Sequence, residues 1–127
     1  MVARLARRDS SRNLGDAELM DLATRLSREY LDSLAVPVSV TWSTRQNSRW
    51  GSCTPADGTI RLSSRLRTMP AWVFHYVLLH ELTHLLVPDH GPDFWAWMQR
   101  YPRAERARGF LEGVAFARDQ PDANDVD

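Results

Sequence analysis

Two histidines and a glutamate, His80, Glu81 and His84, form the segment of this sequence with the clearest chemistry. Residues four apart lie one turn above each other on a helix, so both imidazoles leave the same face with Cβ atoms about 5–6 Å apart. That separation lets both rings reach one zinc ion at about 2.0–2.1 Å. Glu81 flanks such an ion, where it can take a proton from a zinc-activated water and return it to a leaving amine.

A catalytic zinc site needs a third protein ligand and leaves its fourth position open. His90 follows His80 by ten residues, just past the predicted end of the helix, so a chain reversal can return its imidazole to the metal. Asp89 and Asp93 are second choices, either as ligands or as acceptors for ring N–H groups. Glu112, on the last predicted helix, is a third choice.

Two simpler explanations of these residues are weaker. A lone histidine in an apolar helix is usually a core residue, but burying two histidines and a glutamate without a shared partner costs roughly several kcal/mol. A purely structural zinc site is usually rich in cysteine, and Cys53 is the only cysteine of the chain. We therefore expect one catalytic zinc ion per chain.

The helix that carries this segment is apolar on nearly every side between Pro70 and Leu86. Pro70 suits a first helical turn and Pro88 blocks continuation. A helix that is apolar all round is normally the central buried helix of its domain. Upstream, apolar residues at three- and four-residue steps predict an amphipathic helix over 16–34, and strict alternation predicts a strand over 38–43.

Further strands are predicted around 49–54 and 59–63, because Pro55-Ala56-Asp57-Gly58 between them suits a tight hairpin. Two more helices, each opened by a proline, are predicted over 92–101 and 102–117. Together these elements predict an α+β fold. A small antiparallel three-stranded sheet packs on the central helix, with one helix before it and two after it.

The composition is that of a soluble globular domain: 127 residues, 43% hydrophobic, with sixteen arginines, no lysine and sixteen acidic residues. We expect a single domain over 1–127, with a flexible basic start (1–13) and a flexible acidic tail (118–127). Zero net charge argues against a general nucleic-acid coat protein. No run approaches the ~20 apolar residues that span a bilayer. The single cysteine favours a reducing compartment, so we expect a cytoplasmic protein. We also expect it to be a monomer.

An ordered series of short motifs surrounds the histidines. They are Ser48-Arg49-Trp50-Gly51-Ser52-Cys53, Ile60-Arg61-Leu62, Tyr76-Val77, His80-Glu81-Leu82-Thr83-His84, His90 and Phe94-Trp95. This series resembles the YgjP-like metallopeptidase family, relatives of the WLM and SprT-like zinc proteases. The resemblance implies a gluzincin-like, minimal zincin core in which a small sheet lies against the active-site helix and one zinc serves peptide hydrolysis. By position it implies His80, His84 and His90 as ligands and Glu81 as the base.

Four residues near the centre are candidates for oxyanion or substrate contacts. Tyr76, four residues before His80, lies on the metal face, where its hydroxyl can stabilise an oxyanion, although a core position is favoured. Arg49, Trp50 and Ser52 lie on a predicted strand near the cleft. In zinc peptidases of this general build an edge strand aligns the substrate backbone by β-addition. A core position is again favoured for Trp50.

The leading interpretation is a zinc-dependent metallopeptidase that acts on peptide or protein substrates. One alternative is a DNA-associated zinc protein that acts on DNA-bound proteins, because arginines cluster between Arg45 and Arg67 and between Arg100 and Arg108. Arginines on solvated faces explain these clusters more simply. Another alternative is a non-peptide zinc amidase, since the same zinc chemistry serves many bonds.

Overall fold

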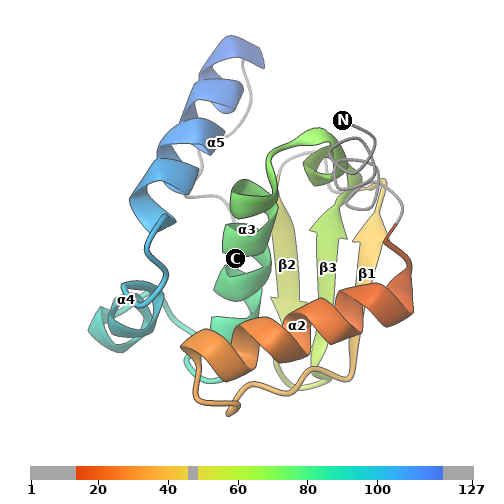
Figure 1. The fold of residues 1–127 in the computed structure, drawn as a ribbon, viewed down its shortest axis with the longest axis vertical. Helices are drawn as coiled ribbons and strands as arrows, with labels where there is room; N and C mark the ends of the chain where they lie inside the picture. Colours follow the sequence, from red (N-terminus) through yellow and green to blue (C-terminus); the bar gives the residue numbers. More distant parts are fainter. Residues whose placement is uncertain (1–13, 46–48, 119–127) are drawn as a thin grey trace, which may run out of the picture.

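The computed structural model describes residues 14–45 and 49–118 (Figure 1). The elements are α2 (Asp16–Tyr30), β1 (Ser39–Ser43), β2 (Gly51–Thr54), β3 (Thr59–Ser63), the 3₁₀ helix η1 (Ser64–Thr68), α3 (Ala71–His84), α4 (Pro92–Met98) and α5 (Ala104–Arg118). The fold is a small α+β fold, as the sequence predicts. The expected basic start lies outside the described residues, as does the expected acidic tail beyond Arg118, which closes α5. None of the described helices is long and apolar enough to cross a membrane.

The three-stranded sheet is mixed, which corrects the expectation of a fully antiparallel sheet. Its order is β1-β3-β2, with β3 antiparallel to β2 and parallel to β1 (Figure 1). The predicted hairpin does join β2 to β3, and Gly58 adopts the positive φ of 70° that its turn requires. The backbone N–H of Val38 donates to the Gly58 carbonyl at 2.7 Å, which sets β1 beside β3. Alternation shows which residues share a face, but it does not identify the neighbouring strand.

Helix α3 is the central element, as its apolar sequence predicts. It contacts α2, α4, α5, β2, β3 and η1, and eleven of its fourteen residues are buried. Figure 1 shows α3 between β2 on one side and α5 on the other. The carbonyl of Pro70 accepts the backbone N–H groups of Val73 and Phe74, so this proline caps the helix start.

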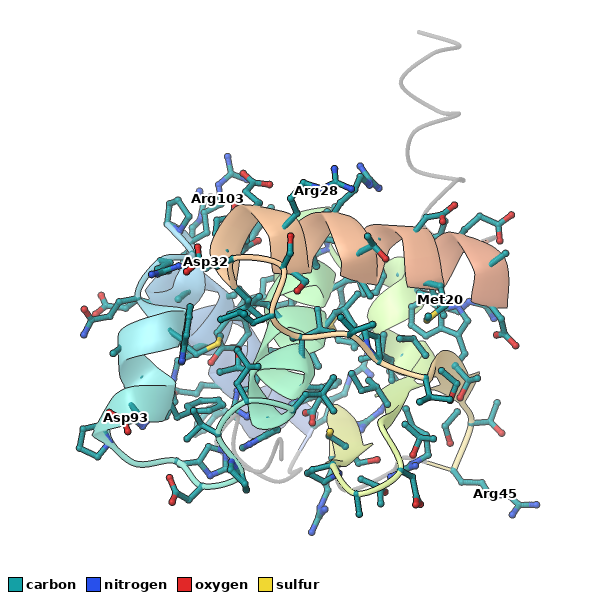
Figure 2. The ribbon with its side chains drawn as sticks, turned by 90° about the horizontal axis from the view of Figure 1, so that it is seen from below. Met20, Arg28, Asp32, Arg45, Asp93 and Arg103 are labelled. Carbon is teal, nitrogen blue, oxygen red and sulfur yellow. The ribbon has the colours of Figure 1, made fainter. Side chains whose placement is uncertain are left out.

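Helix α2 packs on β1 and α3, and it ends four residues earlier than its periodicity predicts. Asp32 and Ser33 both have positive φ values, 56° and 61°, which a continuing helix does not allow. The Ser27 hydroxyl then binds both the backbone N–H and the carbonyl of Ala35, and so fixes the exit of the chain. On the outer side of α2, Arg28 points away from α3 (Figure 2).

Every tryptophan of the chain has an arginine guanidinium over its ring. The pairs are Arg65 with Trp50 (4.2 Å), Arg67 with Trp42 (5.0 Å), Arg100 with Trp97 (4.5 Å), Arg106 with Trp72 (4.8 Å) and Arg108 with Trp95 (4.9 Å). Cation–π pairs occur about once per 70–80 residues, so this chain of 127 has more than twice the usual number. These arginines therefore have a packing role, because a planar guanidinium stacks on an aromatic face better than an ammonium does.

Candidate metal centre

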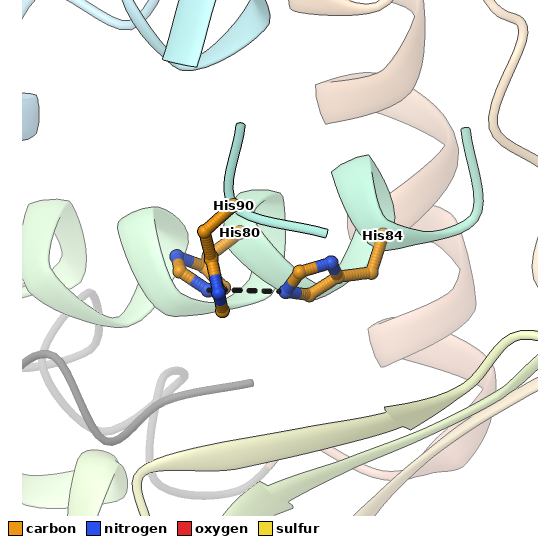
Figure 3. Close-up of side chains that lie close together, drawn as sticks. All are labelled: His80, His84 and His90. Carbon is orange, nitrogen blue, oxygen red and sulfur yellow. Dashed lines mark hydrogen bonds between the residues drawn. The ribbon is translucent and has the colours of Figure 1, made fainter. Parts of the chain in front are cut away.

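The structure brings three of the predicted site residues together: His80 and His84 from α3, and His90 from the turn before α4 (Figure 3). His90 Nε2 lies 3.2 Å from His80 Nε2 and 3.1 Å from His84 Nε2. One ligand atom from each ring lies within 4.8 Å of the other two. His80 and His84 are buried, whereas His90 is exposed, so the cluster opens to solvent on the side of His90.

The chemistry of this donor set fits a zinc ion. His84 Nδ1 lies 3.1 Å from the Val87 carbonyl oxygen, which can only accept, so this nitrogen carries the ring proton. The Nε2 atom of His84 is then a bare lone pair aimed at the other rings. Tetrahedral ligands about 2.0–2.1 Å from zinc lie about 3.3 Å apart, close to the two Nε2–Nε2 spacings given above.

Helix α4 holds the three rings in place. The Phe94 side chain is fully buried, with ring centroids 4.7 Å from His80, 4.7 Å from His84 and 4.9 Å from His90. Trp95 stacks beside His90, with centroids 6.2 Å apart. The sequence suggests only that these aromatics pack on the central helix. Their direct contact with the histidine rings depends on tertiary structure, whereas the Val87 carbonyl that orients His84 lies in the turn that directly follows α3.

The alternative ligands lie outside the cluster. Within residues 14–45 and 49–118, the three histidines form the one group of this kind. Asp89 Oδ1 instead accepts the backbone N–H of Gly91 at 3.1 Å, which organises the turn that presents His90. Asp93 is in the exposed first turn of α4, and Glu112 is exposed on α5. His75, the remaining histidine, lines a separate cavity between α2 and α3, where burial lowers its pKa.

Glu81 has a fully buried side chain that faces strand β2. A Cβ atom on Gly51 would lie 3.2 Å from Glu81 Oε2 and 3.1 Å from Val77 Cγ1. The absence of a side chain at Gly51 therefore lets β2 pass directly against this part of α3. The carboxylate is held between the central helix and β2, one residue along the chain from His80.

We expect Gly51→Ala to lower the free energy of unfolding by about 1–3 kcal/mol, because the added methyl group forces β2 away from α3. Urea unfolding measures this change. Gly109→Ala is the matched control: nothing lies within 4 Å of a Cβ there, and alanine stabilises a helix by about 0.5–1 kcal/mol relative to glycine. Equal stabilisation by both substitutions would show that the close approach at Gly51 is unimportant.

Tyr76 and Trp50 occupy core positions. The Tyr76 side chain is only 1% exposed, and its ring centroid lies 6.1 Å from that of His80. Burial raises the pKa of Tyr76 to about 12, so its hydroxyl stays protonated at neutral pH. Trp50 is buried beneath the guanidinium of Arg65. These positions agree with the favoured core interpretation of both residues.

Ser52 and Arg49 are held by arginines. Arg61 donates to Ser52 Oγ at 2.9 Å and also to the hydroxyls of Thr54 and Thr59, on the face of the sheet away from α3. The carbonyl oxygen of Arg49 accepts a hydrogen bond from Arg65 at 2.9 Å. The Arg65 contact fixes the backbone just before β2, and the Arg61 contact holds the Ser52 hydroxyl. They do not direct the Ser52 side chain toward the histidines.

Fold and cluster together define the class: a small α+β protein in which the central helix and the turn after it bring together three histidines suited to a metal ion. A family model described as YgjP-like, metallopeptidase domain matches residues 5–112. The chain therefore belongs to the YgjP-like metallopeptidase family. No curated protein and no solved structure gave a significant match to this chain.

Proposed function

We propose that this protein is a zinc-dependent metallopeptidase that hydrolyses peptide bonds in peptide or protein substrates. His80, His84 and His90 would hold one zinc ion, and Glu81 would act as the general base. The observation that carries this proposal is the convergence of three imidazole Nε2 atoms, with a fully buried glutamate next to His80 in the chain. Membership of a metallopeptidase family supports it independently.

Glu81 is the residue of this chain that would move the proton. When bound, zinc supplies a Lewis acid that polarises a carbonyl group and lowers the pKa of a water molecule. Glu81 would accept the proton that the attacking water loses and return it to the departing amine. Its side chain is fully buried and lies against Gly51 of β2, so this packing would hold the carboxylate in place for both transfers.

Strand β2 would align the substrate. It pairs with β3 along one edge, and no strand among the described residues pairs with its other edge, which an extended peptide would join. Arg49, Trp50 and Ser52 lie at or just before the start of this strand, where they would shape the backbone that receives the substrate. Tyr76 would position the His80 ring by packing.

The zinc-loaded protein should cleave a permissive unfolded protein, and mass spectrometry of the digest would identify the cut bonds. Small amides tested under the same conditions separate a peptidase from a non-peptide amidase. Cleavage of small amides alone, with every peptide bond intact, would overturn the proposal.

A further inference from the structure

The Phe94 ring has a different relation to each of the three clustered histidines. It is stacked on His84, with an angle of 26° between the ring planes, and it lies edge-on to His80 and His90, at 67° and 81°. Stacked and edge-on pairs with centroids 4.5–7 Å apart are the arrangements that aromatic rings favour. Of the aromatic side chains that the structure describes, Phe94 is the one in contact with all three histidines.

Phe94 reaches the cluster because α4 begins directly after the turn that carries His90. Gly91 precedes the helix and Pro92 opens it, which places Phe94 in the first helical turn, four residues after His90. Side chains on a helix lean back toward its N-terminus, so the ring is directed toward that turn. The same short segment therefore brings the third histidine to the cluster and supplies the ring that supports it.

The Phe94 ring is itself fixed in place. It is fully buried, and so is Met98, one helical turn further along α4. The Thr83 hydroxyl of α3 donates to Met98 Sδ at 3.4 Å, next to His84 in the chain. Helix α4 is therefore anchored to α3 at two successive turns. A ring that has no room to move is a rigid support for the groups that pack on it.

Such a support affects how tightly the cluster holds a metal ion. An ion must find three Nε2 atoms directed at one point, and each imidazole can otherwise rotate about its side-chain torsions. Order that is imposed before binding raises affinity, because the ordering cost is not incurred when the ion binds. The Val87 carbonyl orients His84, and Phe94 packs on that ring as well as on His80 and His90.

We propose that Phe94 is a positioning residue of the metal centre, whose ring holds the imidazoles of His80, His84 and His90 in the arrangement that accepts the ion. The proposal rests on the proposed function only in so far as these three histidines bind a divalent metal. It makes Phe94 a determinant of metal affinity and of ligand geometry, in addition to its place in the core.

The first test measures the zinc affinity of chelator-stripped protein by competition with a chromophoric chelator. Phe94→Leu keeps an apolar side chain but loses the flat ring. Its zinc affinity should be about 10–100-fold weaker, as when a group that orients a metal ligand is removed. Phe94→Met, with a flexible side chain that adapts to irregular space, is a second variant with the same expectation. Wild-type affinity in a folded protein with either substitution would overturn the proposal.

Phe74→Leu is the matched control. Phe74 is buried on α3, and its ring neighbours among the described residues are Trp42 and His75. Both leucine variants should unfold at lower urea concentrations than the wild type, because each loses a buried ring. Only Phe94→Leu should lose zinc affinity. An equal loss of affinity in both variants would show that the ring acts through overall stability, which would also overturn the proposal.

Cobalt(II) gives a second measurement that affinity does not affect. At saturating cobalt, the visible absorption bands depend on how the ligands are arranged around the ion. They should shift in Phe94→Leu and match the wild type in Phe74→Leu. Identical bands in all three proteins would contradict a positioning role.

Neither measurement depends on peptide cleavage, so the two proposals can fail separately. Normal zinc binding with the expected loss in Phe94→Leu, but no cleavage of any peptide, would support the positioning role and contradict the peptidase. A wild-type protein that binds no zinc would overturn both.

Discussion

Glu81→Gln is expected to keep zinc bound and to reduce peptide cleavage by about 10²–10⁴-fold, the usual contribution of a general base. Glutamine matches the size of glutamate, so the close packing against Gly51 is retained. Its amide cannot accept the proton of an attacking water. The proposed ligands are the three clustered histidines, so a change at Glu81 leaves the site for the ion unchanged.

The measurement combines zinc content by mass spectrometry with the initial rate on one peptide. Glu29→Gln is a matched control, since it removes the same charge from α2, which does not contribute to the histidine cluster. It should retain normal cleavage. A Glu81→Gln protein that cleaves at the wild-type rate would show that the base is another group.

His84→Ala is expected to abolish zinc binding at stoichiometric concentration, and cleavage with it. Losing a partner that only orients a metal ligand costs about 10–100-fold in affinity, and losing a ligand itself must cost more. The His84 ring is also oriented by the chain itself, because its Nδ1 proton points to the Val87 carbonyl. The rings of His80 and His90 alone would leave half of a tetrahedral site without protein donors.

His75→Ala is the control on the same helix. His75 is removed from the cluster and lines the cavity between α2 and α3 with Arg25 and Glu29. Zinc content should therefore remain near one ion per chain after this change. Full zinc in the His84→Ala protein, or equal zinc loss in both variants, would show that the cluster is not the metal site.

Much of the fold follows from sequence patterns that lie within a single helix, strand or hairpin. The apolar run before His80 predicts a central helix, and Asp57-Gly58 predicts the β2–β3 hairpin. The parallel pairing of β1 with β3 was not predictable in this way, because alternation does not identify the neighbouring strand. The helical period also continues past the end of α2 at Tyr30. Leu34 fits the helical period, yet it is 59% exposed beyond the positive φ of Asp32 and Ser33.

The candidate site likewise has a part that local sequence predicts and a part that it does not. A four-residue spacing brings His80 and His84 to one helix face, and the turn that follows brings His90 back to them. The sequence does not indicate that Phe94 lies beneath the three rings, nor that Arg108 reaches Trp95. Such contacts join separate elements, and nothing in their local sequence distinguishes them from ordinary core or surface positions.

The most direct test of the central claim is a zinc titration of protein stripped with a chelator, with peptide cleavage as the readout. If His80, His84 and His90 hold the catalytic ion, the stripped protein is inactive, and activity rises linearly and stops rising at one zinc ion per chain. Full cleavage by the metal-free protein, or activity that does not respond to zinc, would contradict this account.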